Sequence, residues 1–355
     1  MKFLDATGLA YFGGKIRTAL SAKQDKLTGS PGQLIGIDGD GTAKVTVYLS
    51  NKNLLDNWYF AGGGSQQGGK MFPINQRGKT IYSGNGAIFD RWRFSGAGTT
   101  ELTPDGIKIT VREGYNLGTL QMLDEGCRQA ISGKTVTLSF LTTDNLYSFS
   151  AELPGDLPAA VLGNLDTEFG AIRLEKQESG TFAAIQLRSE KSPSPITVIA
   201  AKLELGDTQT LAHRENGEWV LNAPPPNYAL ELAECQRYYY VAMQEASDRG
   251  KSITGFANCV AAGSPDNKTV IVYVPTPAAM RANPAIEIEG YFTFHGPGGR
   301  GESSRLDLTD NSGVAGPDMV RFSAKAPNMA EFQTDTVLII GDAEEDTRLA
   351  FSAEL

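Results

Sequence analysis

The sequence predicts a mainly β protein, in which a short N-terminal helical stem precedes two antiparallel β-sandwiches. Polar and apolar residues alternate in many short runs, for example around Ile107, Ile109 and Val111, which is typical of half-buried antiparallel strands. The 40 glycines have no collagen-like period and suit tight turns between such strands. A separate apolar stripe at helical spacing, within the first 20 residues, predicts the stem.

Residues 1–50 are predicted to form this helix and a turn-rich collar. Leu9, Phe12, Ile16 and Ala19 are three or four residues apart and form one apolar stripe. Because so short a helix is marginal alone in water, it must pack on its own chain or on copies of itself. A short strand at 33–37 follows, and then the turn sequence DGDG. No acidic residue occurs at 42–50, so this run predicts a hairpin turn rather than a calcium loop.

Residues 51–207 are predicted to form the first sandwich. Besides the run at 107–111, alternating patterns occur at 135–140 and 199–205. Residues 208–227 then break the pattern and end in three consecutive prolines, Pro224 to Pro226. Because prolines favour stiff, extended chain, this segment is predicted to be a linker.

Residues 228–355 are predicted to form the second β-domain, at the tip of the molecule. A short helix is expected to open it, because Leu232, Cys235, Tyr239 and Met243 lie at helical spacing. Strands are expected to follow at 270–274, 286–288, 320–322, 337–340 and 349–353.

The charge balance argues against two classes of partner. The net charge is −9 and the isoelectric point is near 5.0, whereas nucleic-acid-binding domains usually carry a basic patch. No run approaches 18 apolar residues, so membrane insertion is not expected. No cationic segment followed by an apolar run opens the sequence, so no signal peptide is predicted. The protein is expected to be made and folded in a cytoplasm, and it can act outside the cell if lysis releases it.

The residues that most enzymes need are scarce. His213 and His295 are the only histidines, and the three cysteines are far apart and expected to be reduced. They offer no catalytic triad and no zinc site, so no enzyme activity, no metal and no cofactor is predicted. Calcium held by turn oxygens, as at 307–310, stays open. Acidic residues at 124–125 and 342–346 leave a polysaccharide-cleaving enzyme as an alternative.

Some residues of the sequence have the side chains that sugar recognition requires. Sugars stack on exposed aromatic rings and hydrogen-bond to neighbouring amide, carboxylate or guanidinium groups. In the middle domain, or at its start, these criteria select Tyr115, Asn116, Trp58 and Arg77. At the tip they select Tyr291, His295 and Arg300, around a glycine-rich loop. Two of the aromatics have a competing structural interpretation: Tyr115 as a turn residue packed on the sandwich rim, and Trp58 as a core or seam residue. Trp92 is expected in the core.

Several phrases of the sequence resemble phage and prophage tail-fibre proteins. In the N-terminal part they are residues 3–9 (FLDATGL), 22–29 (AKQDKLTG) and 33–38 (QLIGID). Later they are residues 53–60 (NLLDNWYF), 74–78 (INQRG), 89–92 (FDRW), 201–206 (AKLELG) and 232–239 (LAECQRYY). The phrases at 53–60 and 201–206 also look like those of jelly-roll carbohydrate-binding modules.

This resemblance implies a function in host attachment. It implies a homotrimer held by the N-terminal stem, attached through its N-terminus to tail or baseplate proteins, in a virion or phage-like tail particle. The two β-domains are then expected to have a jelly-roll-like fold and to bind a bacterial cell-surface glycan. A baseplate or injection-machine component without receptor binding is the alternative structural role.

Overall fold

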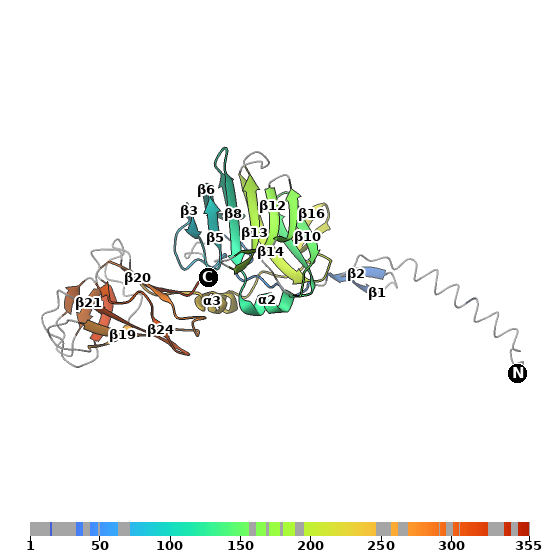
Figure 1. The fold of residues 1–355 in the computed structure, drawn as a ribbon. Coiled ribbons are helices and arrows are strands. Elements are labelled where there is room, and N and C mark those ends of the chain that lie inside the picture. The colour runs from blue at the N-terminus through green and yellow to red at the C-terminus, as the bar shows by residue number, and fades with distance from the viewer. Residues whose placement is uncertain are drawn as a thin grey trace, which may run out of the picture.

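The computed structural model describes residues 15, 33–37, 43–48, 50–62, 72–155, 161–167, 170–177, 180–188, 195–245, 257–261, 269–290, 292–295, 301–304, 306–325, 337–341 and 347–354. It is mainly β and its sheets are antiparallel, which confirms the predicted fold class at that level. Two six-stranded sheets form the centre. A two-stranded hairpin lies at one end of the described structure and strands β19–β21 at the other (Figure 1).

The N-terminal hairpin confirms the strand predicted at 33–37. It consists of β1 (Gln33–Ile37) and β2 (Ala43–Tyr48), which pair antiparallel with Ile37 opposite Ala43. The turn predicted at 38–41 lies outside the described residues. So does the predicted N-terminal helix, except for Lys15, which is helical.

The first six-stranded sheet, here called the β9 sheet, has the order β10-β9-β14-β7-β6-β3. Its strands β7, β9 and β14 confirm the three alternating runs predicted at 107–111, 135–140 and 199–205. The bounds are β3 (Ile81–Ser83), β6 (Gly98–Thr103), β7 (Gly106–Val111), β9 (Thr135–Thr142), β10 (Leu146–Glu152) and β14 (Ile196–Leu205).

The second six-stranded sheet, the β8 sheet, has the order β11-β12-β13-β8-β5-β4. Its bounds are β4 (Gly86–Ala87), β5 (Arg93–Gly96), β8 (Asn116–Met122), β11 (Val161–Thr167), β12 (Gly170–Gln177) and β13 (Gly180–Arg188). The seven-residue helix α2 (Glu125–Ile131) follows β8, and its N-cap is Asp124.

The two sheets share one hydrophobic core, because alternate residues of each strand point to the same side. Ile109 and Leu138 from the β9 sheet are buried in one cluster with Leu117 and Ile185 from the β8 sheet. Trp92 has no exposed surface and lies in the same cluster, as the sequence predicted.

The segment predicted as a linker contains a hairpin. Strands β15 (Ala212–Glu215) and β16 (Glu218–Leu221) pair within residues 208–227, and Leu211 and Ala212 pack on the β9 sheet. A buried carboxylate holds this segment against the β9 sheet. Glu204 accepts the backbone N–H of Thr210 at 2.7 Å and lies 3.3 Å from Lys202 Nζ. A buried carboxylate requires such partners, so the chain stays on the sheet as far as the prolines.

Residues 228–354 begin with α3 (Tyr228–Gln236), which confirms the predicted helix but is shorter than its spacing suggested. Tyr239 and Met243 lie on a strand instead, because Tyr239 pairs with Ser352 in a sheet. That sheet has the order β17-β27-β20 and consists of β17 (Tyr239–Glu245), β20 (Ala285–Glu289) and β27 (Thr347–Ser352).

A further sheet has the order β22-β21-β26-β18-β19-β25-β23, with β24 pairing to β25. Three of its strands cover the runs predicted at 270–274, 320–322 and 337–340, whereas the runs predicted at 286–288 and 349–353 form β20 and β27 of the three-stranded sheet. The bounds are β18 (Ala257–Ala261), β19 (Thr269–Pro275), β21 (Phe292–His295), β22 (Gly301–Ser304), β23 (Asp307–Leu308), β24 (Val314–Ala315), β25 (Met319–Lys325) and β26 (Val337–Gly341).

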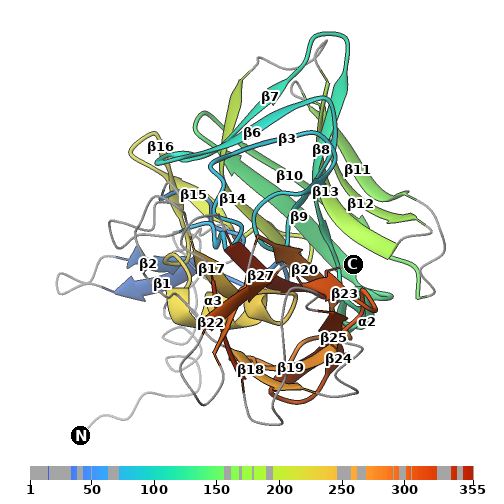
Figure 2. The same cartoon turned by 90° about the vertical axis from the view of Figure 1, so that its left-hand side faces the viewer.

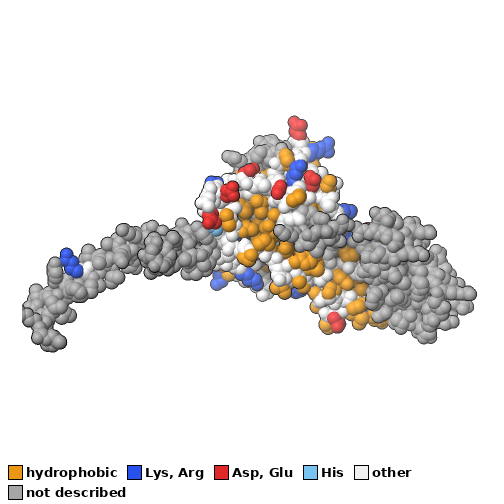
Figure 3. All heavy atoms as spheres, turned by 180° about the vertical axis from the view of Figure 1, so that it is seen from behind, with side chains coloured by type: hydrophobic (Ala, Val, Ile, Leu, Met, Phe, Trp, Pro, Cys, Tyr) orange, Lys and Arg blue, Asp and Glu red, His pale blue; other side chains and the backbone are white. Residues whose placement is uncertain are grey.

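A polar seam joins these C-terminal elements to the central sheets. In Figure 2, α3, β17 and β27 lie directly beneath the strands of the two six-stranded sheets. The guanidinium carbon of Arg77 lies 3.6 Å from the centre of the Tyr239 ring, and that of Arg91 lies 3.5 Å from the centre of the Tyr238 ring. Arg77 also forms an ion pair with Glu354, close to the C-terminus. Seen from behind, hydrophobic side chains gather across the middle of the molecule, with charged groups mostly at its margins (Figure 3).

Candidate functional site

The outer face of the β8 sheet, opposite to the core, contains a hollow of about 500 Å³. Its lining comes from five strands that are widely separated in sequence, and from the turn before β4. It is lined by Asn85, Gly86, Arg93, Phe94, Ser95, Gly118, Leu120, Met122, Arg173, Glu175, Phe182, Ala184 and Gln186.

Strand register explains why the face is hollow at this place. Leu120 pairs with Arg93 on one side and with Ala184 on the other, and Ala184 pairs with Arg173. In the next row, Gly118 pairs with Ser95 and Gln186. Paired residues of antiparallel strands point to the same face. Small residues at the centre, Gly118 and Ala184, therefore leave space that longer side chains surround.

The floor of the hollow is apolar and separate from the core. Met122, Phe182 and Ala184 form a small buried cluster, with half-buried Leu120 packed against it. They are at even positions of strands whose odd positions, such as Leu117 and Ile185, point into the core. The sheet thus buries apolar side chains on both faces at this place.

The wall of the hollow is polar. The guanidinium Nη1 of Arg173 lies 3.4 Å from Glu175 Oε2, which is long for a hydrogen bond. The Nε of Arg173 and the Oε1 of Gln186 are buried without a hydrogen-bond partner within the described structure. Asn85 Oδ1 accepts the backbone N–H of Gly96 at 2.7 Å, which fixes the rim next to β4.

This combination suits the recognition of a sugar. A sugar ring presents C–H groups on its faces, which pack on apolar and aromatic side chains. Its hydroxyl groups require donors and acceptors at the edge, such as Arg173 and Gln186. The hollow provides both within one sheet face.

The residues Tyr115 and Asn116, which the sequence selected, lie next to this face. Asn116 begins β8, two residues before Gly118, and its side chain is therefore on the same side of the sheet. Tyr115 precedes it in the turn and is 49% exposed, with the Arg112 guanidinium carbon 5.1 Å from its ring centre. The structure thus places Tyr115 and Asn116 beyond one end of the hollow.

The other two candidates of this region have structural neighbours. Trp58 is half-buried between the main core and the β15–β16 hairpin, edge-on to Tyr59 with ring centres 6.0 Å apart. Arg77 lies in the seam, where its side chain is only 12% exposed and contacts Tyr239 and Glu354. Neither residue lines the hollow.

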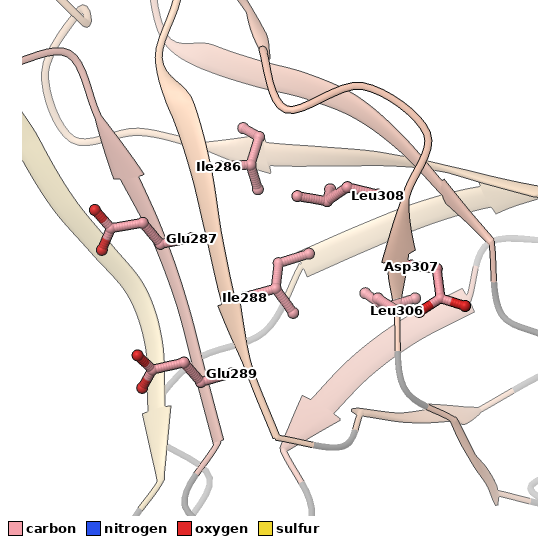
Figure 4. Close-up of a pocket in the computed structure, with 7 residues that line it drawn as sticks. All are labelled: Ile286, Glu287, Ile288, Glu289, Leu306, Asp307 and Leu308. Atoms are coloured by element: carbon pink, nitrogen blue, oxygen red, sulfur yellow. The ribbon is translucent and has the colours of Figure 1, made fainter.

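None of the three candidates at the tip has a described side chain. Tyr291 and Arg300 lie outside the described residues, and of His295 only the backbone is described, as the last residue of β21. A second hollow, of about 540 Å³, lies between β20 and β23. In it Ile286 and Ile288 point toward Leu306 and Leu308, whereas Glu287 and Glu289 point away (Figure 4). Its described lining includes neither an arginine nor an aromatic ring.

The acidic residues considered for catalysis have structural roles where they are described. Asp124 caps α2 by accepting the Cys127 N–H at 2.7 Å, and its other oxygen accepts the Tyr238 hydroxyl at 2.8 Å. These hydrogen bonds lower the pKa of Asp124, although its partial burial acts in the opposite direction. Glu125 pairs with Arg128 on the same helix. Residues 342–346 are outside the described part of the chain.

The described residues contain neither a metal-binding cluster nor a membrane-spanning helix. No group of three or more histidine, cysteine, aspartate or glutamate side chains there is arranged to hold a metal ion. Within the same part of the chain, no helix has the length and apolarity needed to cross a membrane.

Sequence reasoning missed the hollow itself. Most of its residues come from β5, β8, β12 and β13, and the pairing of these strands cannot be read from a local pattern. One signal was present: in β13 both sets of alternate residues are largely apolar, with Phe182 and Ala184 on one face and Ala183 and Ile185 on the other. A strand with two apolar faces indicates that something other than bulk water covers each of them.

Comparison with known proteins assigns no family. No protein-family model and no curated protein matches the chain.

Proposed function

We propose that this chain is a non-enzymatic adhesion subunit of a phage or phage-like tail, which attaches to a bacterial host by binding a surface glycan. The observation that carries the proposal is the hollow of the β8 sheet, with its apolar floor and polar wall. The resemblance of the sequence to tail-fibre proteins supports the biological setting. In this proposal the two β-regions are jelly-roll-like domains, and the particle is a virion or a related tail-like assembly.

The exposed surface supports self-association. Hydrophobic side chains gather on the face seen in Figure 3, and exposed apolar areas are common where subunits associate. Three copies, joined through the N-terminal stem, would present several weak sites to a repetitive glycan and so raise the overall affinity.

The purified protein is therefore expected to be a trimer. Light scattering after size-exclusion chromatography should give a mass close to three times the 38.0 kDa of one chain. The physical reason is that the apolar stripe of residues 9–20 is too short to be stable as an isolated helix. A monomer at micromolar concentration would contradict the fibre arrangement.

Filling the hollow is expected to weaken attachment strongly. A Cβ added at Gly118 would meet only Ser95 O, at 3.6 Å, so a larger side chain there extends into the hollow without strain. We expect Gly118→Leu to reduce the attachment of the full-length protein to whole bacterial cells at least about tenfold, because it occupies the space of the sugar ring. Flow cytometry of labelled protein on a panel of strains measures this.

Gly155→Leu is the matched control, because its added Cβ has no neighbour within 4 Å and lies outside the hollow. It should attach like the wild type. If Gly118→Leu attaches equally well, the glycan site is elsewhere. If the wild type attaches to no strain, the adhesion proposal is wrong and a structural role in the tail or baseplate is favoured. Release of reducing sugars from host polysaccharide would instead support the depolymerase alternative.

A further inference from the structure

We propose that the hollow of the β8 sheet selects an acidic glycan, in which a carboxylate or phosphate group on a sugar lies between Arg93 and Arg173. This inference rests on the proposed function and adds the chemical class of the ligand. It is carried by the charges that surround the hollow and by their spacing.

The lining is cationic on a protein that is strongly anionic. The chain carries a net charge of −9, but among the described residues that line the hollow, Arg93 and Arg173 are accompanied by a single acidic residue, Glu175. A third arginine, Arg188, lies two residues after Gln186 on the same side of β13. A cationic hollow on an otherwise acidic surface attracts anionic ligands.

The two arginines flank the apolar floor. Arg93, Leu120, Ala184 and Arg173 form one row across four adjacent strands. Since neighbouring strands are about 4.8 Å apart, the Cα atoms at the two ends of the row are roughly 14 Å apart. A sugar placed on Leu120 and Ala184 therefore has a guanidinium on each side.

Arg173 has unused donor capacity for such a ligand. Its one hydrogen bond within the described structure is the 3.4 Å contact from Nη1 to Glu175 Oε2. A guanidinium has five N–H donors and binds carboxylate or phosphate in a bidentate manner. Gln186, which has an acceptor oxygen without a partner, stands next to this position and suits a sugar hydroxyl.

The apolar floor indicates that the anion is part of a larger molecule. An inorganic ion would gain nothing from Phe182, Leu120 and Met122, whereas the C–H face of a sugar ring packs on them. Carboxylated and phosphorylated sugars share this combination of an anion with an apolar ring face.

Chemical editing of one glycan tests the inference. The ligand is the purified surface polysaccharide of a strain to which the wild-type protein attaches, used native, with its carboxylates reduced to alcohols, and with its phosphates removed. Binding of each form to the full-length protein is measured by biolayer interferometry at low and high salt. We expect one of the two treatments to weaken binding at least about tenfold, and raised salt to weaken binding of the native form.

Variants of the wall give a second, independent readout. Arg93→Gln and Arg173→Gln should each weaken binding of the native polysaccharide roughly tenfold or more. Glu175→Gln should strengthen it, because it removes a negative charge beside the ligand and releases Arg173. A gain of affinity cannot result from misfolding. Arg321→Gln, which removes the same charge from an exposed position on β25, should change nothing.

The outcomes separate this inference from the proposed function. If the native and both treated polysaccharides bind equally, the acidic selectivity is wrong while glycan binding stands. Weaker binding of Glu175→Gln would also overturn the selectivity. If the native polysaccharide does not bind at all, the proposed glycan function fails and this inference fails with it.

Discussion

Replacing Asn57 with alanine is expected to lower the free energy of unfolding by about 3–5 kcal/mol. The Asn57 side chain is fully buried and makes three hydrogen bonds to backbone. Its Nδ2 donates to Ile74 O at 2.8 Å and to Asp90 O at 2.7 Å, and its Oδ1 accepts the Ile74 N–H at 2.7 Å. Alanine would leave the Ile74 N–H and the Asp90 carbonyl without these partners, while Ile74 O keeps only the Asp90 N–H at 3.2 Å. Urea denaturation followed by tryptophan fluorescence measures the effect.

The control for this variant is Asn216→Ala. Both asparagines have a left-handed backbone with a φ of 51°, so both substitutions introduce the same strain, of about 1 kcal/mol. Asn216, however, is exposed in the turn between β15 and β16. The difference between the two variants therefore isolates the buried hydrogen bonds. Equal losses of stability would show that the Asn57 network contributes little.

The stability of the protein is expected to fall as pH rises from about 5 to 8, and Asp90 should cause much of this fall. Asp90 is fully buried beside the seam, and its carboxylate accepts the Gln76 Nε2–H at 2.8 Å. Burial raises its pKa from 3.8 to about 7, and the neighbouring Glu354 carboxylate acts in the same direction. The hydrogen bonds from Gln76 and the charge of Arg77 oppose this rise but do not cancel it.

The sign of the pH dependence follows from these two pKa values. Below pH 4 Asp90 is protonated in both the folded and the unfolded chain. Between pH 4 and 7 the unfolded chain loses this proton more readily, so the unfolded state is favoured increasingly. Above pH 7 both states are ionised and the effect is constant. The loss of stability from Asp90 between pH 5 and pH 8 should be about 3 kcal/mol.

Asp90→Asn isolates this contribution, because the amide oxygen can still accept the Gln76 hydrogen bond but cannot ionise. Burial also raises the pKa of Glu231 to about 7, so the wild-type pH profile alone does not identify the group. Urea denaturation at pH 5 and pH 8 should show a smaller difference for the variant than for the wild type. Identical differences would mean that Asp90 does not titrate in this range.

These two predictions concern the same part of the molecule. Asn57 binds the backbone of residues 74 and 90, while Gln76 bonds both to Asp90 and to the backbone oxygen of Tyr239 on β17, at 2.6 Å. The buried network of the central sheets is thus continuous with the seam. A change in the ionisation of Asp90 should therefore affect how firmly the C-terminal strands are held.

Local patterns in the sequence determined much of the secondary structure. The alternation at 107–111 predicted β7, because each strand residue points to the side opposite its neighbours and the core accepts only apolar ones. Trp92 was assigned to the core correctly. Its neighbour Arg91, however, has a φ of 71° and is itself buried, against Asp56 and Tyr238, so the residues around Trp92 do not alternate as in a regular strand.

Only the tertiary structure decided where elements end and which strands pair. The helical spacing of Leu232 and Cys235 continues to Tyr239. Tyr239 nevertheless lies on a strand, because it pairs with Ser352, which is more than 100 residues later in the sequence. In the same way, residues 208–227 look like a spacer, but the buried carboxylate of Glu204 holds Thr210 on the sheet. Such partners are invisible in a local window.

The sequence by itself selected Tyr115 and Asn116, because an exposed aromatic beside an amide is a local feature. The hollow depends instead on the row that joins Arg93, Leu120, Ala184 and Arg173. A shift of register by one residue in any of these strands would turn its side chain into the core. Register is set by the packing of the whole sheet against its partner, so the tertiary structure alone determines which charges meet on this face.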